Sequence, residues 1–168
     1  IAASAERRTL DYAWLREIAR GLDVPLCVAG GIRSVAQAIL CLENGADKVS
    51  INSPALERPG FINELAEVAG TQCVVVGIDS RAENGEWYAH QYTGDARTTR
   101  RTSRRMLDWI VEAQELGAGE IVLNCMDSDG TRTGYDIAQL KAARARLSIP
   151  LVASGGAGVA EDFRAVFA

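Results

Sequence analysis

Short apolar stretches alternate along the chain with longer segments of helical periodicity. The apolar stretches are rich in Val, Ile and Leu and lack alternating polar positions, which is typical of parallel strands buried on both faces. This pattern predicts an α/β fold built on a parallel sheet that is covered on both sides. We expect strands at residues 25–29, 48–52, 73–79, 120–125 and 150–154, and helices near 9–21, 34–44, 59–69, 102–116 and 136–147.

Residues 80–101 interrupt this alternation. Asn84-Gly85 is a strong signal for a two-residue hairpin turn, and the flanking residues, which include Trp87, Tyr88 and Tyr92, are typical of short strands. We therefore predict an excursion from the main sheet after the third strand.

One sequence motif occurs twice in the chain. Residues 24–31 (VPLCVAGG) and 149–156 (IPLVASGG) share an aliphatic residue, a proline, an apolar run and a Gly-Gly pair, and their prolines are 125 positions apart, as are Gly31 and Gly156. A helix-like segment beginning with Val-Ala follows each copy. The repeat indicates two related half-structures, each a strand, a glycine turn and a helix.

The length limits how much of a barrel the chain can form. A complete (β/α)8 barrel needs roughly 250 residues, and this chain has 168. We expect residues 1–168 to be one partial TIM-barrel domain, running from the end of strand 2 through the helix after strand 7 and lacking strand 1, most of strand 2 and strand 8.

Composition narrows the functional classes. The net charge of −4 gives no support to nucleic-acid binding, and no apolar run is long enough for a membrane span, so we expect a cytoplasmic protein. Four widely spaced cysteines and a single histidine argue against disulfides and zinc. We expect buried free thiols, no metal and no cofactor.

Candidate chemistry lies where the predicted strands end. Parallel barrel strands share a functional face at their carboxyl ends. Main-chain N–H groups in Gly-Gly turns can hold phosphate, so two such turns suit a substrate with a phosphate at each end, although the glycines could serve only the turns. Asp79 follows the most apolar strand and is the candidate general acid or base, or else a structural cap. The strand ends carry Gly30-Gly31, Asn52-Ser53, Asp79, the loop 127–131 and Ser154-Gly155-Gly156.

These motifs, taken in order, resemble the cyclase subunit of imidazole glycerol phosphate synthase, from histidine biosynthesis. The resemblance covers essentially the whole chain. It is carried by residues 46–53 (ADKVSINS), 74–79 (VVVGID), 117–124 (GAGEIVLN), 129–131 (DGT) with 134–136 (GYD), and 153–158 (ASGGAG).

The resemblance implies a (β/α)8 barrel that takes ammonia from a glutaminase partner in a heterodimer. It converts the bis-phosphorylated ribotide PRFAR to imidazole glycerol phosphate and AICAR without a cofactor. Asp79 matches one of two catalytic aspartates, and the other is expected upstream of Ile1, so this fragment alone is expected to be inactive. The resemblance places Gly31, Asn52 and Ser53 at one phosphate, Gly130 and Gly156 at the other, Asp129, Ser154 and Gly155 in the substrate loop, and Lys48 and Glu120 at the ammonia gate.

Two alternatives remain. The sister isomerase of the same pathway shares the Gly-Gly turns and the half-barrel repeat, although residues 50–53 and 154–158 look more like the cyclase. The second alternative is a non-catalytic partial barrel that binds phosphate or associates through open sheet edges.

Overall fold

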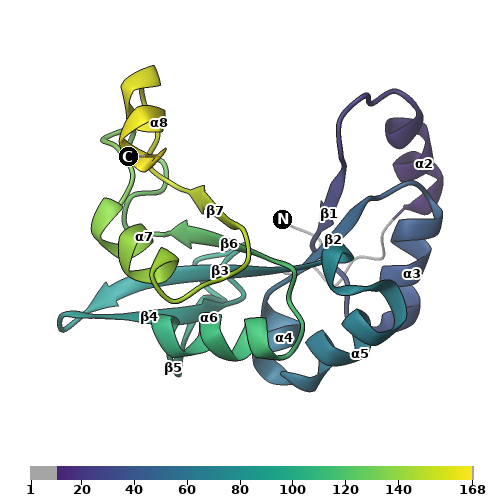
Figure 1. Cartoon of the computed structure of the whole chain (residues 1–168), viewed down its shortest axis with the longest axis horizontal. Coiled ribbons are helices and arrows are strands. Elements are labelled where there is room, and N and C mark those ends of the chain that lie inside the picture. Colours follow the sequence, from purple (N-terminus) through teal and green to yellow (C-terminus); the bar gives the residue numbers. More distant parts are fainter. Residues whose placement is uncertain (1–10, 168) are drawn as a thin grey trace.

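A curved parallel sheet forms the centre of the computed structural model, which describes residues 11–167. Five parallel strands pair in the order β1-β2-β3-β6-β7, with β1 and β7 at the two ends (Figure 1). This arrangement confirms the predicted α/β class and is a half-barrel, consistent with part of a (β/α)8 barrel. The parallel strands are β1 (Cys27–Ala29), β2 (Lys48–Ile51), β3 (Val74–Glu83), β6 (Glu120–Cys125) and β7 (Leu151–Ser154).

Helices follow the strands and cover one side of the sheet (Figure 1). Ser34 and Asp136 are the N-caps of two of these helices, since the side chain of Ser34 accepts from the Gln37 amide and that of Asp136 from the Gln139 amide. The helices are α2 (Tyr12–Arg20), α3 (Val35–Glu43), α4 (Ser53–Glu57), α5 (Gly60–Ala69), α6 (Met106–Glu115), α7 (Ile137–Arg144) and α8 (Ala160–Phe167), with a 3-10 turn at Thr71–Cys73.

The expected excursion is an antiparallel hairpin. β3 continues past Asp79 and pairs with β4 (Glu86–Gln91), and Asn84 and Gly85 both have positive φ at the predicted turn. β5 (Arg100–Arg105) then pairs with β4. The prediction that a helix begins at residue 102 is therefore wrong, because residues 100–105 form the third strand of the excursion and α6 begins at Met106.

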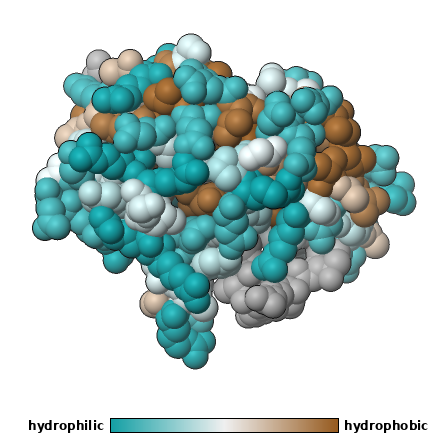
Figure 2. All heavy atoms as spheres, turned by 90° about the horizontal axis from the view of Figure 1, so that it is seen from below, coloured by the Kyte–Doolittle hydropathy of each residue, from teal (hydrophilic) through white to brown (hydrophobic). Residues whose placement is uncertain are grey.

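The core lies between the sheet and its helices. Trp109 of α6, Phe61 and Leu65 of α5, and Val76 and Leu123 of the central strands are fully buried or nearly so. The helix side, seen from below in Figure 2, is mainly hydrophilic, with hydrophobic side chains in separate patches. This distribution is that of an amphipathic helix layer packed on a sheet.

The prediction that both faces of the sheet are covered is wrong. Helices cover one side, and the central strands β2 and β6 alternate buried with intermediate residues (Figure 1). The end strands are more open: Ala29 of β1 is exposed and Val152 of β7 is 43% exposed, since β1 and β7 each have one strand partner in the described part of the chain.

The prediction of buried free cysteines holds only in part. All four cysteines are free, and Cys41 and Cys125 are buried, but Cys27 is exposed on β1 and Cys73 is intermediate. Gly45, Gly70 and Gly117 have the positive φ expected after a helix, whereas Gly21 has φ −96°. The first predicted helix is described from Tyr12, and its residues 9 and 10 lie outside the described range.

Candidate active site

A cavity of about 270 Å³ lies at the carboxyl ends of the parallel strands, with polar side chains set in a mainly apolar lining. Gly31, Asn52, Ser53 and Asp79 all line it, so the structure brings together the candidate carboxylate and all three residues assigned to the first phosphate. Asn124, at the carboxyl end of β6, also lines it. These residues come from the segments that follow β1 and β2 and from the strands β3 and β6, and the parallel arrangement gathers them at one end of the sheet.

Asp79 is held by three hydrogen-bond donors. Its Oδ2 accepts from Asn52 Nδ2 at 2.7 Å and from the Thr93 hydroxyl, and its Oδ1 accepts from Asn124 Nδ2 at 2.8 Å. The two asparagines follow from the strand register, because Asp79 lies directly opposite Asn124 and Asn52 directly follows β2. The side chain is half-buried and faces the cavity, where a ligand can reach it.

The same two asparagines present acceptors that have no donor. Asn52 Oδ1 and Asn124 Oδ1 are buried and have no hydrogen-bond partner within the described part of the chain. Because a carboxylate only accepts, each Nδ2 must face Asp79, and each Oδ1 is thereby directed elsewhere. Buried acceptors without partners are costly, and Asn124 Oδ1 lies on the side of Gly155, which is outside the lining of the cavity.

Ser53 connects the first phosphate position to the excursion. Its Oγ accepts the Tyr92 N–H at 2.9 Å, and its main-chain oxygen accepts from Gln91 Nε2 at 3.3 Å. Because Oγ already accepts the Tyr92 amide, its own hydroxyl hydrogen stays available to a phosphate oxygen.

The second glycine turn packs against the loop after β6. Gly155 lies so that an added Cβ would be 3.0 Å from Asn124 Oδ1 and 3.4 Å from the Asp129 Cα. The main-chain oxygen of Gly156 accepts from the Gly134 N–H at 2.9 Å. The structure thus brings Ser154 and Gly155 next to Asn124, with Asp129 beside Gly155, whereas Gly156 packs against Gly134 and a Cβ at Gly130 would meet nothing within 4 Å. Five residues assigned to the second phosphate and the substrate loop do not line the cavity: Asp129, Gly130, Ser154, Gly155 and Gly156.

A carboxylate already occupies part of this second turn. Asp162 Oδ2 accepts the N–H groups of Gly158 at 2.7 Å and Val159 at 2.9 Å, and these bonds hold the pKa of Asp162 below its usual range. Asp162 thus caps the start of its own helix, α8, and these two amides are taken in this structure.

Lys48 and Glu120 form an ion pair at the opposite end of the strands. Lys48 Nζ lies 2.6 Å from Glu120 Oε2, and the two residues open β2 and β6 on either side of β3. Cys27 of β1 lies near the pair, and its thiol pKa is raised by burial, then by Glu120, against a lowering from Lys48. Ser50, Gly77 and Val122 line the lower part of the Asp79 cavity, between this pair and Asp79 along their strands.

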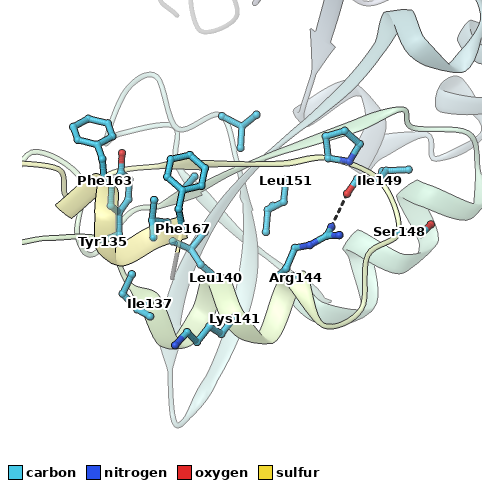
Figure 3. A pocket seen from close by; sticks show the side chains of 14 residues that line it. Tyr135, Ile137, Leu140, Lys141, Arg144, Ser148, Ile149, Leu151, Phe163 and Phe167 are labelled. Carbon is cyan, nitrogen blue, oxygen red and sulfur yellow. Dashed lines mark hydrogen bonds between the residues drawn. The ribbon is translucent and has the colours of Figure 1, made fainter. Parts of the chain in front are cut away.

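A larger cavity lies elsewhere. A groove of about 950 Å³ runs between α7, β7 and α8, with the aromatic rings of Tyr135 and Phe163 at one end and the Arg144 guanidinium donating to the Ile149 oxygen at the other (Figure 3). Its lining is mainly apolar and includes none of the candidate site residues. Size alone therefore does not locate the chemistry of this chain.

Within residues 11–167, no group of three or more His, Cys, Asp or Glu side chains is placed to hold a metal ion. No helix in the same range is long and apolar enough to cross a membrane.

Sequence reasoning missed Thr93 and did not select Asn124. Asn124 had a signal, since it is a polar residue near the carboxyl end of an otherwise apolar strand. Thr93 had none, because it reaches Asp79 only through the folding of the excursion.

The chain is similar in sequence to known proteins over nearly all of its 168 residues. The family model for histidine biosynthesis proteins matches residues 1–168. Proteins named imidazole glycerol phosphate synthase subunit HisF are 60% identical over 168 residues in Xanthomonas campestris pv. campestris (strain 8004), and 59% identical over 167 residues in Maricaulis maris (strain MCS10). Each alignment covers 99% of this chain, which spans 65% and 66% of the length of these relatives respectively. The chain belongs to the histidine biosynthesis protein family.

Proposed function

We propose that this chain is the major part of the cyclase subunit of imidazole glycerol phosphate synthase. In this proposal the protein combines PRFAR with ammonia and releases imidazole glycerol phosphate and AICAR. The observation that carries the proposal is the position of Asp79, a carboxylate held by two asparagines in a cavity that Gly31 and Ser53 also line. The names of the relatives support the cyclase over the sister isomerase.

Asp79 has the role of one general acid or base. Ammonia attacks the imine carbon of the substrate, and Asp79 exchanges protons with the reacting nitrogens during elimination and ring closure. The second aspartate of the cyclase pair has no counterpart assigned within these 168 residues, so the complete cyclase is the protein in which to test the reaction.

The substrate phosphates have two proposed positions. Gly31, Asn52 and Ser53 bind one phosphate at the cavity wall, where the Ser53 hydroxyl hydrogen is available. Gly130 and Gly156 take part in the other, and their positive φ supports this assignment, since glycine turns of this kind let main-chain amides approach a phosphate. Asp129, Ser154 and Gly155 form the adjoining substrate loop.

The partner is a glutaminase subunit that docks at the amino-terminal ends of the strands. Lys48 and Glu120 guard the entrance for ammonia there, and their 2.6 Å ion pair supports a joint role. Ammonia passes Ser50, Gly77 and Val122 to reach Asp79, and Gly77 supports this route because it adds no side chain beside Ser50.

We infer that the domain is a partial barrel, with the apolar groove beside β7 as the seat of a further strand and helix. The exposure of Val152, Phe163 and Phe167 supports this, since an apolar edge of this kind is normally covered.

Substitution of Asp79 by Asn tests the proposal. Asn keeps the shape of the side chain but cannot exchange a proton in the same way, so turnover of PRFAR with ammonium salts in the complete cyclase should fall by about a thousandfold or more. Binding of PRFAR, measured by calorimetry, should change by less than about threefold, because the phosphate residues are untouched. Near-normal turnover by the variant would refute the role of Asp79.

A further inference from the structure

The loop between β4 and β5 reaches over the candidate active site. Tyr92, Thr93 and Gly94 belong to this loop and line the same cavity as Asp79. The loop belongs to the antiparallel excursion and is not part of the repeated strand and helix units.

Several hydrogen bonds hold the loop in this position. Tyr92, at φ 55°, donates its N–H to Ser53 Oγ, and its main-chain oxygen accepts from the Thr98 hydroxyl at 2.8 Å. The Asp95 carboxylate accepts from the Arg97 guanidinium and main chain, which closes the far end of the loop. A positive φ at a tyrosine costs roughly 1–2 kcal/mol, so the surrounding bonds must fix it.

Thr93 follows this turn and is directed at Asp79. Its hydroxyl donates to Asp79 Oδ2, the oxygen that also accepts from Asn52 Nδ2. Within residues 11–167, Oδ1 accepts only from Asn124. A carboxylate oxygen has two in-plane lone pairs, so Oδ2 is fully used and Oδ1 keeps one free.

We propose that Thr93 is a positioning residue that fixes the Asp79 carboxylate so that Oδ1 is the oxygen that exchanges protons with the substrate. The excursion thereby has a role in catalysis, since it supplies the one donor to Asp79 that does not come from the parallel sheet or the turn after β2. The inference rests on the proposed cyclase function. Loss of the hydroxyl frees the second lone pair of Oδ2 and lets the carboxylate rotate, which lowers the population of the reactive geometry.

The test compares Thr93→Val, which removes the hydroxyl at nearly constant shape, with Thr93→Ser, which keeps it. In the complete cyclase, with PRFAR and ammonium salts, Thr93→Val should lower kcat by about tenfold to a hundredfold, because hydrogen bonds to charged groups are worth that much. KM should stay within about threefold, and Thr93→Ser should keep at least about half of the kcat. Thr99→Val is the matched control, since Thr99 belongs to the same loop and its hydroxyl donates to the Asp95 main-chain oxygen instead.

Three results would overturn the positioning role: normal kcat in Thr93→Val, an equal loss in Thr93→Ser, or a loss confined to KM. Thr93→Ala is a second variant that creates no clash, and its kcat must fall as that of Thr93→Val does even if the valine variant folds poorly. Asp79→Asn in the same assay separates the two proposals. If Asp79→Asn is inactive and Thr93→Val is normal, only the role of Thr93 fails, whereas an active Asp79→Asn refutes the proposed function itself.

Discussion

Two glycines of the second candidate phosphate site allow a controlled comparison of backbone strain with steric contact. Gly130 has φ +75° and Gly156 has φ +107°, so alanine is strained at both positions. This strain costs roughly 1–2 kcal/mol in the free energy of unfolding. An added Cβ at Gly130 meets nothing within 4 Å, whereas at Gly156 it would lie 2.1 Å from the Gly134 main-chain oxygen.

The difference between the two alanine variants therefore measures the contact. Gly156→Ala must displace Gly134, and it loses the 2.9 Å hydrogen bond from the Gly134 N–H to the Gly156 oxygen, worth about 0.5–1.5 kcal/mol. We expect Gly130→Ala to destabilise by about 1–2 kcal/mol and Gly156→Ala by about 3 kcal/mol or more.

Urea unfolding of the ligand-free protein, followed by circular dichroism, measures both values, and an unchanged m-value shows that the same transition is compared. Losses that agree within about 0.5 kcal/mol would refute the steric argument. Calorimetry with PRFAR then separates stability from binding. Gly130→Ala should weaken PRFAR binding, while its free energy of unfolding falls by no more than the strain given above. Unchanged affinity for PRFAR would contradict a phosphate role for Gly130.

Two further predictions concern the ion pair and the cysteines. Lys48→Met should change the free energy of unfolding by less than about 1 kcal/mol, because the Lys48 and Glu120 side chains are 33% and 17% exposed. The variant should lower glutamine-driven turnover more than ammonia-driven turnover. An equal effect on both would contradict a gate. Cys27 should react with a thiol reagent faster than Cys41 and Cys125 because it is exposed and they are buried, although its raised thiol pKa slows the reaction at pH 8. Burial, followed by Asp136 and Asp127, raises the pKa of Cys125 to about 12, above its ordinary value of 9.0. The folded state then holds this proton more tightly than the unfolded state, so the stability contribution of Cys125 is complete below pH 9 and is lost as the pH rises toward 12. Urea unfolding at a series of pH values, with Cys125→Ala as the control, measures this loss.

Local patterns determined most of the secondary structure. The apolar run that opens β3 needs no tertiary information, since consecutive positions buried on both faces of a strand must all be apolar. β2 and β6 bury every second residue. Ser34 and Asp136 are likewise local, because an N-cap depends on the amides of its own first turn. The Asn84-Gly85 turn was predictable because few residues tolerate positive φ at two successive positions.

The sequence also placed Asp79, Asn52, Ser53 and Gly31 at strand ends. Parallel strands present these ends on one side, so their common location follows from topology alone. Which residues contact Asp79 does not follow, because that depends on the β3–β6 register and on the path of the excursion.

Tertiary structure decided the features that depend on distant partners. Residues 100–105 form a strand because β4 offers an unpaired edge, which overrides the helical pattern expected from residue 102. Cys27 and Val152 are exposed because a strand is buried only when others flank it, whatever its own side chains are. Thr93 reaches Asp79 from 14 positions away along the chain, and no spacing rule anticipates a hydrogen bond that exists only after the hairpin has folded back over the sheet.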